Sequence, residues 1–308
     1  MIYTLTANPA IDMNLSSCGI MGKVVNRTFD AVYTPNGKGL NVSYCLKRFQ
    51  TQSAVLGFFG GFSGRFVVDE TRKRGIKTYP VWVNDTTRIN IFLNDGKEEY
   101  KFVNEGSYVS PGKQKNLYRL LETLNDMDTL IISGSLPKGV KDSFYDEVME
   151  ICQRKRTPVI LDISSPHLKY LIGCRPYLIK PNDEEIKEIF GIVMRDEADV
   201  KDVLKDLYES GARNILLTLG DRGSYFYNGS ALYHAGTKKV RLVSSACAGD
   251  AALAGFLSIW MNQPYEIEGA LKRSAAVGAN VAESSGLGLM DRVEDYTKEI
   301  IVRKVEGV

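Results

Sequence analysis

Short apolar runs alternate with segments of helical spacing along most of this 308-residue chain, and this alternation limits the possible folds most strongly. Met1–Thr6, Thr129–Ser133 and Asn214–Leu219 are short apolar runs, so we predict strands there. Lys113–Leu124 and Ser143–Lys155 repeat apolar residues at helical spacing, so we predict helices. Strands separated by helices run mostly parallel, and the sequence therefore predicts an α/β fold with helices on both faces of one sheet.

Two stretches break this rhythm because their predicted strands follow one another without a helix between them. The first holds candidate strands near Asp12–Ser16 and Val25–Tyr33. The second consists of Arg88–Leu93 and Glu99–Val103 around an Asn-Asp-Gly turn, which is typical of a hairpin. Taken alone, these strands predict a plain pair of edge hairpins.

Composition and charge indicate a globular protein with no nucleic-acid or membrane partner. The length allows one large α/β domain or two smaller ones. Hydrophobic residues make up 44% of the chain and the formal net charge is only +2, so there is no basic nucleic-acid footprint. No apolar run approaches the ~18 residues of a membrane span, and the N-terminus lacks the pattern of a signal peptide. The five cysteines are widely spaced and odd in number, which favours reduced thiols in the cytoplasm over disulfides or a zinc site.

Several common kinds of site are disfavoured by what the sequence lacks. Its two histidines, His167 and His234, are far apart, which argues against a His-dependent triad or a zinc hydrolase. No G-x-x-x-x-G-K-[ST] sequence occurs, so a P-loop kinase is disfavoured. No G-x-G-x-x-G sequence occurs either, because Val42 and Asp291 stand where the third glycine belongs; this counts against a nicotinamide enzyme on a similar sheet.

The run Ser245–Gly255 predicts an anion site at the start of a helix. Small residues precede Asp250, and the apolar segment Ala251–Trp260 that follows looks helical. The unpaired N–H groups and the positive dipole end of a helix N-terminus can hold a phosphate. A carboxylate beside that phosphate can take a proton from an attacking hydroxyl. The run therefore favours phosphoryl transfer to an alcohol, with an Asp that only caps a core helix as the simpler alternative.

A second motif, Thr34–Ser43, is a Gly-rich turn that leads into a helical pattern. Its glycines let a ligand approach the backbone. Lys38 is a point charge suited to a phosphate, and Asn41 can donate and accept hydrogen bonds with sugar hydroxyls. Asn-Gly is also an ordinary turn, so this motif alone leaves both interpretations open.

These two motifs and four others, in order along nearly the whole chain, resemble the ribokinase/PfkB family of sugar kinases. The resemblance implies one ribokinase-like domain over residues 1–308, with ATP and Mg²⁺ as cofactors. It also implies a small β-sheet lid, formed by about residues 11–35 and 85–105, that excludes water from the substrate and pairs two subunits into a homodimer. The motifs that carry it are Thr4–Asp12, Asn36–Asn41, Ser133–Pro137, Lys180–Glu185, Thr218–Gly223 and Cys247–Asp250.

The resemblance also assigns a role to each matched residue. Asp250 is matched to the catalytic general base, and the backbone N–H groups of Ala248, Gly249 and Asp250 to an anion hole for the γ-phosphoryl group. Asn182 and Glu185 are matched to a pair that supports Mg²⁺, mostly through water. The substrate side comprises Asp12, Gly37, Lys38, Asn41, Arg88, Asn90 and Ser135, of which the Arg fork suits a phosphate already on the sugar. The nucleotide side comprises Asn182, Glu185, Thr218, Gly220, Gly223, Cys247 and Asn280.

The chain departs from the family pattern at three positions. Asn36 replaces the first of two glycines, a mild change because Asn tolerates positive φ. Ala251 replaces a Ser or Thr, and Cys247 replaces a glycine. Because Cys247 lies near helix N–H groups, we expect an ionised, reagent-sensitive thiol that MgATP protects. The alternative is an inert cysteine packed in the core.

Within the family, Asn8–Asp12 and Gly57–Phe62 look most like the 1-phosphofructokinase branch. This implies ATP-dependent conversion of fructose 1-phosphate to fructose 1,6-bisphosphate, with tagatose 6-phosphate as the alternative acceptor. A hypothesis from another class is a phosphosugar-binding regulator that has lost turnover through Cys247 and Ala251. The retention of Asp250 and Lys38 argues against this regulator.

Overall fold

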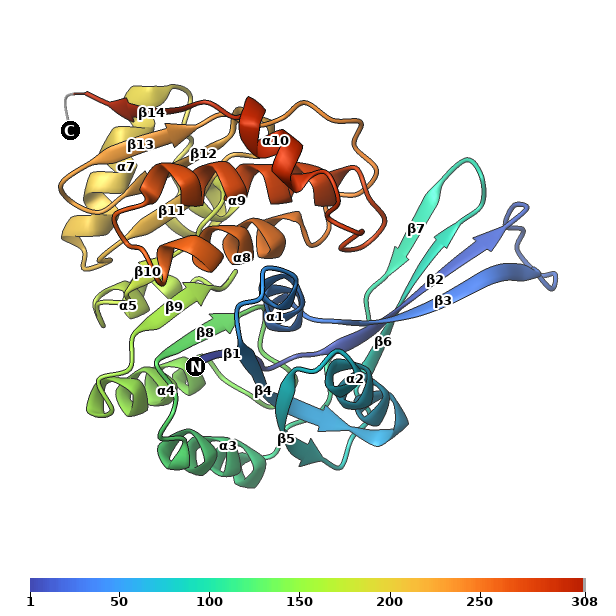
Figure 1. The fold of residues 1–308 in the computed structure, drawn as a ribbon. Coiled ribbons are helices and arrows are strands. Elements are labelled where there is room, and N and C mark those ends of the chain that lie inside the picture. Colours follow the sequence, from blue (N-terminus) through green and yellow to red (C-terminus); the bar gives the residue numbers. More distant parts are fainter. Residues whose placement is uncertain (307–308) are drawn as a thin grey trace.

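Ten strands form one sheet in the computed structural model, which describes residues 1–306. The sheet order is β14-β13-β12-β11-β10-β9-β8-β1-β4-β5, and every pairing from β5 to β11 is parallel (Figure 1). The parallel strands are β1 (Ile2–Thr6), β4 (Ser53–Gly60), β5 (Lys77–Val83), β8 (Thr129–Ser133), β9 (Val159–Asp162), β10 (Leu178–Ile179) and β11 (Ile215–Thr218). Antiparallel strands β12 (Ser224–Tyr227), β13 (Leu232–Ala235) and β14 (Val302–Val305) complete one edge.

Helices cover both faces of this sheet, as the alternation of strands and helices predicts. Successive strand residues point to opposite faces, so Leu130 and Ile132 join one buried cluster while Ile131 joins the other. Each fully buried Leu or Ile side chain contributes about 1.5–3 kcal/mol. One face carries α3 (Pro111–Thr123), α4 (Ser143–Arg154), α5 (Leu168–Ile172) and α7 (Glu197–Glu209). The other carries α1 (Lys38–Arg48), α2 (Gly61–Lys73), α8 (Ala248–Trp260), α9 (Ile267–Ala282) and α10 (Val293–Glu299).

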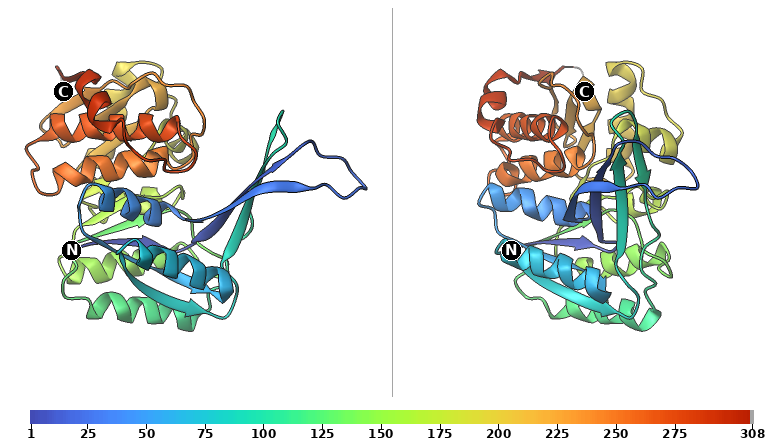
Figure 2. Two further views of the ribbon diagram at one scale, coloured as in Figure 1. Left: turned by 45° about the vertical axis from the view of Figure 1, so that its right-hand side comes forward. Right: turned by 90° about the vertical axis from the view of Figure 1, so that its right-hand side faces the viewer.

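A second sheet of four strands, called the small sheet here, projects away from the main body (Figures 1 and 2). Its order is β3-β2-β6-β7, and the parallel pairing of β2 with β6 joins the two predicted hairpins into one sheet. The small sheet is therefore continuous, whereas two separate edge hairpins would not be. Its strands are β2 (Ala10–Ser17), β3 (Thr28–Asn36), β6 (Arg88–Asn94) and β7 (Glu99–Phe102).

Some elements differ from the sequence prediction. The spacing after Asn182 predicts one helix over Asp183–Phe190, but the structure divides it into α6 (Asp183–Glu185) and a π-helical turn, Ile186–Phe190. Strand β14 was not predicted, because an edge strand with exposed Arg303 and Lys304 lacks a continuous apolar run. Within residues 1–306, no helix combines the length and apolarity needed to cross a bilayer.

Candidate active site

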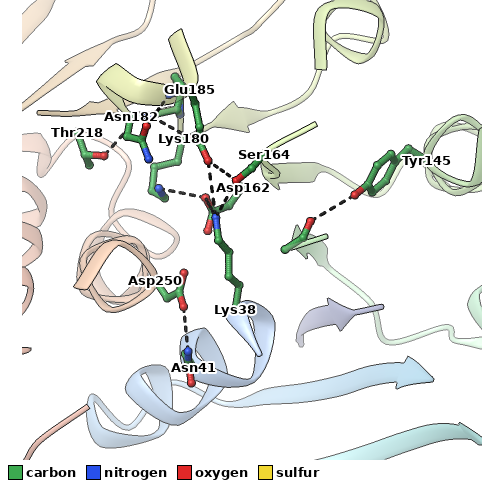
Figure 3. Close-up of polar contacts among 12 residues, drawn as sticks. Lys38, Asn41, Tyr145, Asp162, Ser164, Lys180, Asn182, Glu185, Thr218 and Asp250 are labelled. Carbon is green, nitrogen blue, oxygen red and sulfur yellow. Dashed lines mark hydrogen bonds and ion pairs between the residues drawn. The ribbon is translucent and has the colours of Figure 1, made fainter. Parts of the chain in front are cut away.

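The predicted site residues gather where the parallel strands end and where α1 and α8 begin. Ligand crevices in α/β sheets lie outside the carboxyl ends of the strands. Here β9 ends at Asp162, α1 begins at Lys38, and Asp250 lies in the first turn of α8 (Figure 3). Gly37 makes this close approach possible, since its φ is 147° and a Cβ there would lie 2.5 Å from Thr6 Cγ2.

Asp250 is a buried carboxylate, with only 6% of its surface exposed. Its Oδ2 accepts a hydrogen bond of 2.9 Å from Asn41 Nδ2, drawn in Figure 3. Burial and the nearby charge of Asp162 raise the pKa of Asp250 to about 7, against the lowering effect of Lys38. A carboxylate whose pKa lies near neutrality is suited to act as a general base.

The backbone before Asp250 forms a tight turn with positive potential. Cys247 occupies the position before α8 with φ 65°, a left-handed conformation that explains why glycine suits this place in the family. The first N–H groups of α8 have no partner within the helix, although that of Ala248 reaches Ser245 O at 3.4 Å. A Cβ built on Gly249 would lie 3.7 Å from Lys180 Nζ, so an ammonium group adjoins this turn. The turn can therefore hold an anion.

The Cys247 thiol differs from the sequence expectation of an ionised, reactive group. Its pKa is raised to about 12, first by burial and then by the charges of Asp250 and Asp12, so the predicted thiolate is wrong. Its Sγ accepts a 3.2 Å hydrogen bond from Asn41 Nδ2. The thiol lines the same cavity as Asp12.

We therefore expect Cys247 to react slowly with iodoacetamide at pH 7.5. Cys18 is exposed and should be labelled at least about tenfold faster, because only the thiolate reacts and a raised pKa suppresses it. Peptide mass spectrometry over time measures both sites in one sample, and labelling in urea supplies the unfolded reference. Cys247 labelled ahead of Cys18 in the folded protein would contradict this account.

A chain of side chains links the small sheet to Asp250. Asp12 on β2 accepts hydrogen bonds from Asn36 Nδ2 and, at 2.9 Å, from Asn90 Nδ2. Asn36 Oδ1 in turn accepts from Asn41 Nδ2 at 2.8 Å, and Asn41 is the residue that holds Asp250. Burial raises the pKa of Asp12, and the two amide donors oppose that rise. These residues, Asn90 and Asp250 excepted, line a cavity of about 1050 Å³.

Arg88 carries a guanidinium group that forms no ion pair among residues 1–306. It lies two residues before Asn90 on β6, so both side chains share one face of the small sheet. Its Nη atoms donate to the carbonyl oxygens of Asn8 and Asn104, each at 3.2 Å, and its buried Nε has no partner in the described chain. Ser135 lies nearby, accepting from Asn8 Nδ2 at 3.2 Å. A half-buried cation without a carboxylate suits an external anion such as a phosphate.

A buried ion network occupies the other side of Lys38. The Lys38 ammonium lies 3.7 Å from both Asp162 Oδ1 and Glu185 Oε1, and donates to Ser164 Oγ at 3.3 Å (Figure 3). Lys180 Nζ lies 3.0 Å from the same Asp162 oxygen. The pKa of Lys38 is raised chiefly by the charge of Asp162. Lys38 therefore points toward Glu185 and the predicted nucleotide side.

Sequence reasoning did not single out Asp162, Ser164 or Lys180 as site residues. A signal was present, since Asp162 ends β9 and Lys180 directly follows β10, its parallel neighbour. Polar residues at the carboxyl ends of adjacent parallel strands meet at one edge of a sheet. This rule would have found both residues.

The residues predicted to support phosphate and metal form a compact cap at the start of α6. Asn182 Oδ1 accepts from Glu185 N at 2.7 Å, and Asn182 N donates to Glu185 Oε2 at 3.0 Å. Asn182 also bridges Thr218 at the end of β11, where Gly220 and Gly223 form the following turn with positive φ. Asn280 lies on α9, where its Nδ2 donates to Glu283 Oε1 at 2.9 Å.

This cap does not offer a direct metal-binding site. Glu185 Oε1 accepts from Ser164 and faces Lys38, while Oε2 is bonded to the backbone of Asn182. Among residues 1–306, no group of three or more acidic, His or Cys side chains is arranged to hold a metal ion. The residues fit Mg²⁺ only through intervening water, in keeping with the preference of Mg²⁺ for water and phosphate ligands.

Known proteins resemble this chain over nearly its whole length. The chain is 46% identical over 302 residues to D-tagatose-1-phosphate kinase of Klebsiella oxytoca, covering 98% of this chain and 99% of that protein. It is 31% identical to 1-phosphofructokinase of Bacillus subtilis, over 99% of this chain and all of that one. The solved structure of phosphofructokinase-2 from Escherichia coli shares the fold, with a TM-score of 0.88 at 22% identity, covering 97% of this chain and 98% of that one.

The sequence profile described as pfkB family carbohydrate kinase matches residues 4–292, nearly the whole chain. The ribokinase-like fold predicted from the sequence is confirmed by the similar solved structures. The relatives are sugar-phosphate kinases, which transfer a phosphoryl group to an alcohol, and this favours an enzyme over a regulator without turnover. The chain belongs to the pfkB family of carbohydrate kinases and is a phosphosugar kinase.

Proposed function

We propose that this kinase phosphorylates the free primary hydroxyl, at C6, of a ketohexose 1-phosphate, and that D-tagatose 1-phosphate is its preferred acceptor. The observation that carries the proposal is the hydrogen-bonded chain that joins Asp12, a sugar-binding carboxylate in the family, to Asp250. The relative named for tagatose 1-phosphate is 46% identical, whereas the one named 1-phosphofructokinase is 31% identical. Fructose 1-phosphate, the epimer at C4 and the acceptor expected from the sequence, is the second candidate.

Asp250 is proposed to take the proton of the acceptor hydroxyl as that oxygen attacks the γ-phosphorus of ATP. Its Oδ2 already accepts from Asn41, so Oδ1 is the oxygen available for the proton. The N–H groups of Gly249 and Asp250 and the adjacent Lys180 ammonium would stabilise charge on the transferred group. The bond from the γ-phosphorus to its bridging oxygen breaks, and ADP leaves.

Mg²⁺ is proposed to accompany ATP, held by the nucleotide phosphates and by water that contacts Asn182 and Glu185. When bound, the ion would neutralise negative charge on the phosphates. Lys38 and Lys180 add two fixed positive charges next to that region. The chain itself therefore supplies the base, the anion hole and the cations, while the nucleotide brings the metal.

Release of ADP measured with a panel of sugars tests the proposal. The panel holds tagatose 1-phosphate, fructose 1-phosphate, tagatose 6-phosphate, fructose 6-phosphate and the unphosphorylated ketoses. We expect the largest kcat/KM with tagatose 1-phosphate, then fructose 1-phosphate, and little turnover of the others. Preference for a 6-phosphate or an unphosphorylated sugar would overturn the proposed acceptor.

Arg88→Ala is expected to raise the KM for the sugar phosphate by about 10- to 100-fold while leaving the KM for ATP within about twofold. The reason is that the guanidinium forms no direct ion pair among residues 1–306, although Asp12 lies near it, and it is proposed to bind the C1 phosphate. Steady-state kinetics with each substrate varied in turn measures both constants. Arg88→Lys keeps the charge but loses the fork, so its KM should lie between those of the parent and the Ala variant. Equal changes in both KM values would reject this role.

We propose that the small sheet acts as a lid and also forms a homodimer interface. Tyr33, Met13, Ile91 and Phe102 stand side by side across all four strands, on the face opposite Asp12. Tyr33 and Phe102 are about half exposed, at 51% and 53%. Such an apolar row suits a second copy of the same sheet. The related phosphofructokinase-2 of Escherichia coli has a tetrameric form, which supports self-association in this fold.

Sedimentation velocity at micromolar concentration should therefore give a dimer. Tyr33→Glu places a charge at one end of the row, on the edge strand β3, and should shift the protein to a monomer. Tyr265→Glu is the matched control, because Tyr265 is 81% exposed and lies outside the small sheet. A monomeric parent, or equal dimerisation of both variants, would contradict the proposed interface.

We also propose that the protein works in the cytoplasm. All five cysteines are free thiols in the structure, including the exposed Cys18. Unpaired thiols are typical of a reducing compartment. Fractionation of cells that express the native chain tests this, with recovery in an oxidising compartment as the contrary result.

A further inference from the structure

Asn36 occupies the junction between the small sheet and the first helix of the main body. It is the last residue of β3, pairs with Ala10 across to β2, and is followed by Gly37 and the start of α1. Its side chain is half-buried and lines the cavity shared with Asp12 and Asn41. A glycine, which usually stands here in the family, has no side chain to make these contacts.

The direction of each hydrogen bond in the chain of side chains is set by two backbone donors. The N–H of Gly37 donates to Asn36 Oδ1 at 2.6 Å, so the amide oxygen of Asn36 must face that side. Its nitrogen must then face Asp12. At the other end, the N–H of Asn104 donates to Asn90 Oδ1 at 3.2 Å, so Asn90 also presents its nitrogen to Asp12.

Two consequences follow from this fixed polarity. Both oxygens of Asp12 accept from amide N–H groups, and these two donors favour the ionised carboxylate there. Because the oxygen of Asn36 faces Asn41, Asn41 must present its nitrogen, and the same nitrogen reaches Asp250 Oδ2. Asp250 is thereby kept as an acceptor on Oδ2, and its proton-accepting position is confined to Oδ1.

We propose that Asn36 is a positioning residue that orients both the sugar-binding carboxylate Asp12 and, through Asn41, the base Asp250. This inference rests on the proposed function, in which Asp12 binds the sugar and Asp250 takes the proton. It adds a role for a side chain that the family's usual glycine cannot perform. Asn36 links Asp12 on the small sheet to Asp250 on α8, so the acceptor sugar and the base keep a fixed position relative to one another.

Asn36→Ala removes all three hydrogen bonds of this side chain, to Asp12, Asn41 and Gly37 N, and is the first test. We expect the KM for the sugar phosphate to rise about 10- to 100-fold, because Asp12 loses a charged hydrogen bond. We also expect the acidic limb of the kcat profile to move to higher pH, because Asn41 is no longer held with its nitrogen toward Asp250. The KM for ATP should stay within about twofold. The charged and titratable groups that face Asp250 and remain unchanged are Lys38, Cys45, Asp162, Lys180 and Cys247.

An exchanged pair supplies the sharper test. Asp12→Asn alone leaves an amide facing two amide donors, from Asn36 and Asn90, and one of these contacts must fail. Asn36→Asp alone places two carboxylates together. In the double variant Asp12→Asn/Asn36→Asp, the new amide accepts from Asn90 and donates to the new carboxylate, which still accepts from Gly37 and Asn41. We expect its KM for the sugar phosphate to be lower than that of either single variant.

Asn228→Ala is the matched control, because Asn228 Oδ1 likewise accepts two N–H groups, both from the backbone, but lies in the turn between β12 and β13. It should change neither KM nor the pH profile. A parent-like KM and acidic limb in Asn36→Ala would overturn the inference, as would a double variant no better than both single variants. If the single variants fold poorly, the test is whether the double variant folds and regains binding of the sugar phosphate. All constants are measured with the phosphosugar that the parent turns over best. A wrong choice of acceptor in the proposed function would therefore show in the sugar panel measured with the parent, and would not affect this test.

Discussion

Asp250→Asn is expected to lower kcat by about 10²- to 10⁴-fold, which is the usual contribution of a general base. The amide keeps the shape of the carboxylate and can still accept from Asn41, so binding of sugar and ATP should be nearly unchanged. Rapid-quench or coupled assays give kcat, and calorimetric titration gives both dissociation constants. A variant with near-normal kcat would remove Asp250 from this role.

The same substitution should make the folded protein more stable at pH 8. The pKa of Asp250 is raised to about 7 in the folded state, so the folded protein binds this proton more tightly than the unfolded chain does. Ionisation of Asp250 therefore destabilises the fold increasingly from about pH 4, the ordinary Asp value, and fully above about pH 7. Asn cannot ionise, so the gain in melting temperature should be largest at pH 8 and vanish near pH 4.

Asp202→Asn serves as the control, because Asp202 is an exposed residue of α7. It should change neither kcat nor the pH dependence of melting. A loss of stability in Asp250→Asn at pH 8 would indicate that Asp250 mainly holds the structure. Loss of activity with a gain in stability is the combination that marks a group placed for chemistry at a cost to the fold.

Asp162→Asn is expected to destabilise the folded protein by about 3–5 kcal/mol, the usual effect of removing one partner from a buried ion pair. Asp162 is fully buried, and Lys180 is only 4% exposed with its Nζ 3.0 Å from Asp162 Oδ1. Without the carboxylate, the buried Lys180 ammonium would lose its ion-pair partner, while Lys38 would keep Glu185. Denaturant unfolding at pH 7 measures the loss of free energy.

The pH dependence of this loss has a fixed sign. Burial alone would raise the pKa of Asp162, but the ammonium groups of Lys180 and Lys38 outweigh it and lower the pKa. The stabilisation by Asp162 is therefore present above the ordinary Asp pKa of about 4 and is lost as pH falls below it. The difference between the parent and Asp162→Asn should be full at pH 7 and smaller at pH 3.

Two further variants complete this test. Asp295→Asn breaks a 2.9 Å ion pair with Lys298 on the surface of α10 and should leave stability almost unchanged, because water screens that pair. Asp162→Asn/Lys180→Met removes both charges of the buried pair and should recover part of the loss. If Asp162→Asn is no less stable than Asp295→Asn, the network is not a buried ion pair of the kind described.

The strands and helices could be predicted from the sequence because their signals are local. Thr129–Ser133 is apolar throughout because a strand of a covered parallel sheet is buried on both faces, and the structure has β8 over those residues. The motif at Asp250 was readable for a similar reason, since small residues followed by an apolar segment indicate the start of a buried helix. Edge strand β14 lacked such an apolar run, because exposed strand positions such as Arg303 and Lys304 accept polar residues.

By itself the sequence predicted the α/β class, the strands of the small sheet and the candidate site residues, such as Asp12, Asn41 and Asp250, whose roles remain proposals. Only the tertiary structure decided the hydrogen-bond partners of these residues and the pKa values of the titratable groups. Asn36 and Asp250 are 214 positions apart, yet Asn41 joins them with hydrogen bonds of 2.8 and 2.9 Å. The pKa of Cys247 rises although it precedes a helix, because burial acts on it together with Asp250, three residues on, and Asp12, which lies far away in the sequence on β2. Burial and charge depend on neighbours in space, and the chain order does not state which neighbours those are.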